Sequence, residues 1–116
     1  MSAPGAVRDE VLRDLRAAYA KLVTADARES LAEERDDTRR EVGRLIGRLH
    51  LAIMELENTK LAEMADALEA NEDDLRTASR SLREKAEALR EFADVLETGA
   101  KALKSLARLF PLLMCL

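Results

Sequence analysis

Leucine recurs every seven residues in the C-terminal half of the chain, and this spacing limits the possible folds more than any other feature. The repeat consists of Leu75, Leu82, Leu89, Leu96 and Leu103, and Phe110 takes the next position of the series. Such a period lines apolar side chains along one seam of a helix, where other helices pack at coiled-coil geometry. A second column, of small residues, runs beside the first: Ser79, Ala86, Ala93, Ala100 and Ala107. Because small side chains let a neighbouring backbone approach closely, the two columns predict tight helix–helix packing.

The composition favours an all-α protein. Ala, Leu, Glu and Arg dominate a chain of 116 residues, of which 36% are charged and 3% are aromatic. We find no segment in which apolar and polar residues alternate as in a strand, and a chain of this length supplies one domain. We therefore expect residues 1–116 to form a single coiled-coil-like helical bundle.

The pattern predicts three helices and an apolar tail, over 6–23, 26–70, 72–110 and 111–116. Pro4 and Gly5 oppose an earlier start of the first helix. Thr24 or Asp26 can cap the second helix after a bend, which a shift in the heptad phase favours.

The residues around Asn71 predict a tight reversal of the chain. Asn71 offers a capping side chain, and the three acidic residues that follow it suit a helix N-terminus. The second and third helices then form a long antiparallel hairpin, with Gly43 beside Gly99 and Ala100, and the first helix packs on this hairpin. The remaining residues that we expect at helix contacts are Leu12, Leu15, Tyr19, Ile46, Leu49, Ile53 and Leu106.

Few residues are suited to catalysis. His50 is the single histidine, Cys115 is the single cysteine, and we find no Gly-rich phosphate loop, HExxH or CxxC motif. His50 lies in the apolar middle of the second predicted helix, where a bundle histidine is a better interpretation than a ligand. We expect a protein that is not an enzyme, with no catalytic residues, no metal ligands and no cofactor.

Two groups of acidic residues offer carboxylates for a metal site: Glu33, Glu34 and Asp37, and then Glu63 and Asp66. They loosely resemble the EExxE…ExxD magnesium motif of the all-α nucleotide pyrophosphohydrolases of the MazG type. The resemblance implies that the two halves converge on a metal ion from different helices. On one continuous helix, however, Glu34 and Glu63 would lie ~44 Å apart. A metal-dependent nucleotide hydrolase is therefore the least favoured alternative, and it requires a helix break near 43–47.

The C-terminal segment 99–116 is cationic and amphipathic. An apolar face continues the leucine repeat, and basic residues lie opposite to it; such a helix can lie on an anionic membrane surface. The candidate membrane contacts are Lys101, Lys104, Arg108, Phe110, Leu112 and Leu113. In the other interpretation, the same segment packs inside the bundle.

The apolar surface exceeds what one hairpin can cover, and this excess predicts the function. We expect a non-enzymatic oligomerisation or partner-binding module, such as an adaptor or assembly subunit, whose partner is a second copy or another helical protein. Nucleic acid is disfavoured, because the net charge is −4 and the arginines alternate with acidic residues. The N-terminus does not resemble a signal peptide, so the expected location is the cytoplasm, with peripheral membrane binding as the alternative.

Overall fold

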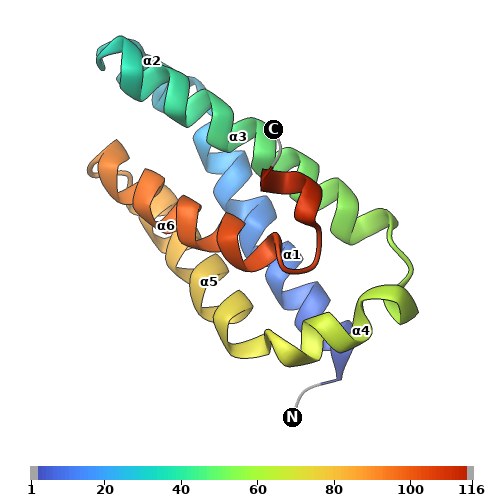
Figure 1. The fold of residues 1–116 in the computed structure, drawn as a ribbon. Helices are drawn as coiled ribbons and strands as arrows, with labels where there is room; N and C mark the ends of the chain where they lie inside the picture. Colours follow the sequence, from blue (N-terminus) through green and yellow to red (C-terminus); the bar gives the residue numbers. More distant parts are fainter. Residues whose placement is uncertain (1–2, 115–116) are drawn as a thin grey trace.

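The computed structural model describes residues 3–114, which form six α-helices and a short 3-10 helix without any strand (Figure 1). This arrangement confirms the expected all-α bundle. The helices are α1 (Pro4–Leu22), α2 (Ala25–Ala32), α3 (Asp36–Asn58), α4 (Leu61–Ala70), α5 (Glu72–Ala88), α6 (Phe92–Leu106) and the 3-10 helix η1 (Pro111–Met114).

Helix α1 is the centre of the bundle. It packs on α3, α4 and α5, while α6 packs on α5 and on α3. Its buried face includes a stripe that repeats at intervals of three and four residues: Val7, Val11, Leu15, Ala18 and Leu22. This spacing buries one stripe of a helix, and the helix that we expected to cover a hairpin instead lies between the others.

The start of the chain follows the predicted bend closely. Helix α1 begins at Pro4 rather than at residue 6, because proline is well suited to the first turn of a helix. A new helix follows Thr24, whose hydroxyl accepts a hydrogen bond from the amide of Ala27 at 3.2 Å. The side chain of Thr24 therefore caps the start of α2, where the chain changes direction after α1.

The predicted second helix, 26–70, is three helices in the structure. Turns at 33–35 and 59–60 separate α2, α3 and α4. Asn58 and Thr59 are poor helix formers, and the backbone of Thr59 is extended, with φ −77° and ψ 135°. This break lets α4, whose Met64 and Leu68 are buried, pack on α1.

The predicted third helix, 72–110, is also divided. Helix α5 ends before Leu89, which adopts the left-handed conformation with φ 37° and ψ 56°, and its amide donates to the Lys85 carbonyl at 2.8 Å. Helix α6 then runs back alongside α5 (Figure 1). The reversal that we expected at Asn71 therefore lies at residues 89–91, where the sequence has neither glycine nor proline.

At Asn71 the chain turns a corner instead of forming a hairpin. The Asn71 side chain makes no cap; its Nδ2 donates to the Ala67 carbonyl at 2.8 Å. Helix α5 begins at the next residue, while α4 packs mainly on α1 rather than beside α5. Residues 26–70 consequently do not pair with α5 in the predicted way.

Gly99 of α6 packs tightly against Leu45 of α3. A Cβ added at Gly99 would lie 2.6 Å from Cδ1 of Leu45, so the Leu45 side chain fills the space that glycine leaves open. Gly43, which we expected at this contact, faces open space, as does Gly47. The contact between α3 and α6 is thus formed by Leu45 of α3 packed against Gly99 of α6.

Candidate functional site

Most of the leucine repeat lies inside the core of the chain itself. Leu75, Leu82 and Leu103 are buried, and Leu89 and Leu96 are partly buried against the same core. The other predicted contact residues that are buried are Leu12, Leu15, Leu49, Ile53, Ala86, Leu106 and Phe110. Tyr19 and Ile46 pack on the edge of the core. The repeat therefore joins helices of one chain, and a site has to be sought on the remaining surface.

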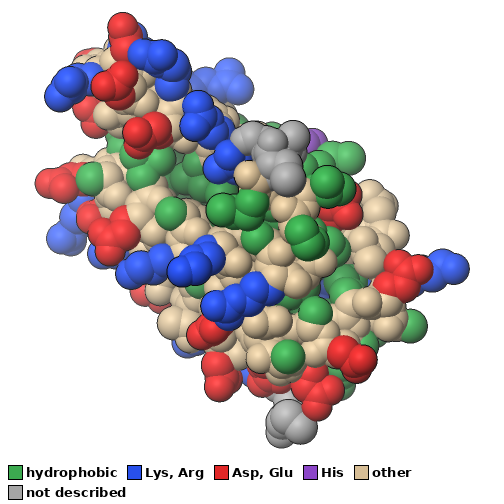
Figure 2. Space-filling view, in the orientation of Figure 1, with side chains coloured by type: hydrophobic (Ala, Val, Ile, Leu, Met, Phe, Trp, Pro, Cys, Tyr) green, Lys and Arg blue, Asp and Glu red, His purple; other side chains and the backbone are tan. Residues whose placement is uncertain are grey.

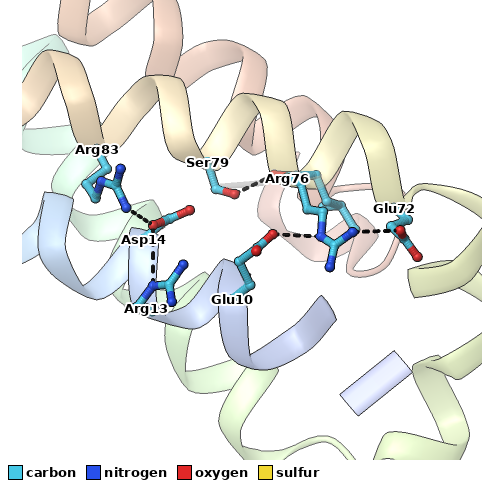
Figure 3. Close-up of polar contacts among 8 residues, drawn as sticks. Glu10, Arg13, Asp14, Glu72, Arg76, Ser79 and Arg83 are labelled. Carbon is cyan, nitrogen blue, oxygen red and sulfur yellow. Dashed lines mark hydrogen bonds and ion pairs between the residues drawn. The ribbon is translucent and has the colours of Figure 1, made fainter. Parts of the chain in front are cut away.

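The clearest polar arrangement is an ion-pair cluster between α1 and α5. We call it the α1–α5 cluster; it contains Glu10, Arg13, Asp14, Glu72, Arg76 and Arg83. Figure 3 shows the carboxylates of Glu10 and Asp14 pointing from α1 toward α5. The cluster links α1 to α5 at two positions along the helices, which we call its two levels: one around Asp14 and one around Arg76.

Asp14 is the most deeply buried charged residue of the described chain, with 2% of its surface exposed. Its Oδ1 accepts a hydrogen bond of 2.6 Å from Nη1 of Arg83, and Nε of Arg13 lies 3.9 Å away. A buried carboxylate is tolerated only beside a compensating charge. The pair therefore fixes how α1 and α5 align along their axes.

The second level of the α1–α5 cluster is centred on Arg76. Its guanidinium lies 2.6 Å from Oε2 of Glu10 on α1 and donates to Oε2 of Glu72 at 2.8 Å. One turn further along, the hydroxyl of Ser79 donates to the Leu75 carbonyl within α5. These ion pairs link α1 with α5, whereas Oε1 of Glu72 is buried without a hydrogen-bond partner.

Sequence reasoning missed the α1–α5 cluster, although one signal was present. Asp14 lies three residues after Val11 and four before Ala18, on the stripe that α1 buries. A carboxylate on such a stripe requires a cation from a neighbouring helix. The sequence does not reveal that this cation is Arg83, 69 residues away.

A groove between α5 and α6 is polar and cationic. We call it the α5–α6 groove; it has a volume of about 380 Å³ and is lined by Asp74, Thr77, Ala78, Ser81, Thr98, Lys101, Lys104, Ser105 and Arg108. Lys and Arg side chains gather along α6 in this region (Figure 2). At one end, Arg108 donates to Asp74 at 2.8 Å and to Asn71 at 3.2 Å. The predicted membrane cations Lys101, Lys104 and Arg108 therefore border a groove of the bundle.

On its other side, α6 borders α3. A hollow of about 260 Å³ there has Leu45, Leu96, Ala100 and Leu103 as apolar lining and Glu41, Arg44 and Arg48 as polar lining. Figure 2 shows hydrophobic side chains within this hollow. Ala93 and Ala100, which belong to the predicted small-residue column, are exposed along α6. Ala100 itself lines the hollow, beside Leu96 and Leu103 of the same helix.

The histidine and the acidic residues do not converge. His50 is exposed and its ring lies 5.5 Å from that of Tyr19, at a tilt of 34°. Glu34 precedes α3 and Glu63 follows it, so the full length of a helix separates them. Among residues 3–114, no group of three His, Cys, Asp or Glu side chains is placed to hold a metal ion. The arrangement implied by the MazG-type resemblance is therefore not formed.

The C-terminal segment packs back on the bundle. Phe110 and Leu113 are buried, whereas Leu112 is 69% exposed and Met114 is also exposed. Residues 115–116 of the predicted apolar tail, including Cys115, lie outside the described residues. Among residues 3–114, no helix combines the length and the apolar character that crossing a bilayer requires.

Comparisons of the chain with known protein families, with curated proteins and with solved structures found no significant match.

Proposed function

We propose that this protein is a non-enzymatic helical assembly module whose copies associate through the exposed edge of α6. This edge, which we call the α6 edge, consists of Ala93, Glu97, Ala100 and Lys104, all of them exposed. Their spacing of four, three and four residues keeps them on one narrow stripe of the helix. The observation that carries the proposal is the approximate symmetry of the charges about Ala100, with Glu97 three residues before it and Lys104 four residues after it.

The symmetry suits an antiparallel pair of α6 helices. A two-fold axis beside Ala100 brings Ala100 of one copy onto Ala100 of the other. The same axis sets Ala93 level with Ala107, and it brings Glu97 within one residue of Lys104, about 1.5 Å along the helix. In a two-fold interface each such contact occurs twice, because both copies present the same surface. Small residues on the axis permit close approach, and opposite charges flank them.

The charges of α6 support this orientation. Glu91, Asp94 and Glu97 lie at its start, and Lys101, Lys104 and Arg108 lie at its end. A parallel pair would bring like charges together, whereas an antiparallel pair brings opposite charges together. Because each protomer already buries its own core, we expect a concentration-dependent equilibrium between monomer and dimer rather than an obligate dimer.

Sedimentation over a range of protein concentrations tests the proposal. We expect the wild-type protein to associate, and Ala100→Trp to remain monomeric because a large side chain separates the two backbones. Ala62→Trp, at an exposed alanine of α4, is the matched control and should associate like the wild type.

A charge exchange tests the orientation of the pair. Glu97→Lys alone and Lys104→Glu alone should each weaken association, and the double variant should restore it. A wild-type protein that stays monomeric at every concentration would overturn the proposal. Association that Ala100→Trp leaves intact would move the interface elsewhere.

Membrane-surface binding is the second candidate, and the exposure of Leu112 and Met114 favours it. Two exposed apolar side chains are a smaller apolar area than a whole amphipathic face, and Phe110 and Leu113 are occupied by the core. Flotation with anionic liposomes tests this candidate independently of self-association.

A further inference from the structure

The hydroxyl of Ser105 differs from the other polar groups that the bundle buries. Ser105 is 7% exposed and lines the α5–α6 groove. In α5, the buried Ser79 hydroxyl donates to the carbonyl four residues earlier, and in α6 Thr98 does the same with Asp94 at 2.8 Å. The Ser105 side chain has no such bond, nor any other hydrogen bond within residues 3–114. The Ser105 oxygen is not among the fully enclosed atoms that lack a partner, so the hydroxyl is open to the groove and free to donate to a molecule there.

Cationic groups surround this hydroxyl on the same side of α6. Lys101 and Ser105 are four residues apart and share one face of α6, and Arg108, just after the helix, lines the same groove. From α5, Thr77 and Ser81 bring further hydroxyls to the opposite wall. The groove thus offers charged donors and neutral donors to the same small volume.

We propose that the α5–α6 groove binds the phosphate group of a small phosphomonoester, with Lys101, Ser105 and Arg108 as its donors. Phosphate oxygens accept several charge-assisted hydrogen bonds at once, and Arg and Lys are the side chains that usually supply them. Three cations line the groove against one carboxylate, that of Asp74, so its lining carries an excess of positive charge.

Arg108 makes two exposed contacts before any ligand arrives. Its Nη1 contacts both Asp74 and Asn71, which leaves the remaining guanidinium donors to face other groups. Lys101 is less constrained, because its Nζ lies 3.4 Å from Glu97 in an exposed pair. We expect an incoming phosphate to draw Lys101 away from Glu97, since exposed ion pairs of this kind are weak.

The volume of the groove indicates a ligand larger than the phosphate group alone. About 380 Å³ is available, and small-molecule sites commonly begin at about 300 Å³. Phenyl phosphate is therefore a suitable probe beside inorganic phosphate. Benzoate, which carries a carboxylate in place of the phosphate, separates a phosphate site from a general anion site.

Titration followed by amide chemical shifts tests the inference. At constant ionic strength, we expect saturable shifts at Ser81, Lys101 and Ser105 with phenyl phosphate, weaker binding of inorganic phosphate and little response to benzoate. Ser105→Ala should weaken phenyl phosphate binding about tenfold, as expected for loss of a hydrogen bond to a charged group. Lys101→Gln should weaken it at least as much, and it changes an exposed side chain that folding does not require.

Lys85→Gln is the matched control, because it removes one exposed cation of α5 outside the groove. It should bind phenyl phosphate like the wild type. The inference is overturned if no saturable shift occurs, if benzoate binds as well as phenyl phosphate, or if Ser105→Ala and Lys101→Gln both bind like the wild type. It does not rest on self-association, since Ala100→Trp should leave phosphate binding intact.

Discussion

The carboxylate of Asp14 in α1 accepts a 2.6 Å hydrogen bond from the guanidinium of Arg83 in α5, across 69 residues of sequence. Apolar contacts between two helices tolerate sliding, because burial of apolar surface has no direction. A buried carboxylate does not tolerate such sliding, because it loses its charged partner when the helices shift by one turn. The pair therefore selects one alignment of the two helices that share the most extensive contact in the bundle.

Asp14→Ala should lower the free energy of unfolding by about 2 kcal/mol, because it removes a charged hydrogen bond and leaves Arg83 without its inward partner. Urea denaturation measures the change. Asp9→Ala, five residues earlier and exposed, should stay within about 0.5 kcal/mol of the wild type. The double variant Asp14→Leu, Arg83→Met should recover most of the loss. A single variant as stable as the wild type would remove the alignment role from this pair.

The three helical glycines of α3 and α6 should respond differently to alanine. Gly43→Ala and Gly47→Ala meet no neighbouring atom and should each stabilise the fold by roughly 1 kcal/mol. Gly99→Ala should lose this gain, because its methyl group would lie 2.6 Å from Cδ1 of Leu45. Thermal unfolding compares the three variants. In a Leu45→Ala background, Gly99→Ala should become stabilising; a gain of equal size in both backgrounds would contradict the close contact.

A pair of substitutions at Leu89 tests its left-handed backbone conformation. Leu89→Gly and Leu89→Ala remove the same partly buried side chain, but only glycine adopts φ 37° without a steric penalty. The glycine variant should therefore be more stable than the alanine variant by about 1 kcal/mol. Urea denaturation of both proteins measures the difference. Equal stabilities would mean that the chain reverses by another conformation.

Neighbouring leucines near the C-terminus should behave in opposite ways. Leu113 is fully buried, so Leu113→Ala should cost about 3 kcal/mol. Leu112 is mostly exposed, so Leu112→Ala should change stability by less than about 0.5 kcal/mol. Thermal unfolding separates the two. If the segment also binds membranes, Leu112→Ala should reduce flotation with anionic liposomes; no flotation of either protein would leave the segment with its role in the core alone.

The periodicity of the sequence predicted the buried faces better than the helix ends. The repeat continues across the reversal, since Leu82, Leu89 and Leu96 keep a spacing of seven although they lie on α5, in the turn and on α6. Because the seven-residue spacing is unbroken at this turn, the sequence pattern gives no sign that the chain reverses direction. At Asn71, in contrast, the capping pattern predicted a hairpin, but the chain only bends there. It bends because α4 packs on α1 and not alongside α5.

The polar sites were harder to predict, because they depend on which helices become neighbours. Arg83 and Asp14 are ordinary residues of two charged helices until α1 packs on α5. Ser105 likewise becomes a candidate binding residue only because α6 packs beside α5. Periodicity identifies the side of a helix that is buried, but it does not name the helix that buries it.

The central position of α1 also affects the order in which the protein can fold. Helix α1 is synthesised before α3, α4 and α5, which cover its apolar stripe, and its largest partner, α5, begins at residue 72. The apolar stripe of α1 therefore stays uncovered until α5 has been made. Folding has to wait for distant segments to meet, which slows it and exposes α1 to aggregation or to a chaperone in the interval.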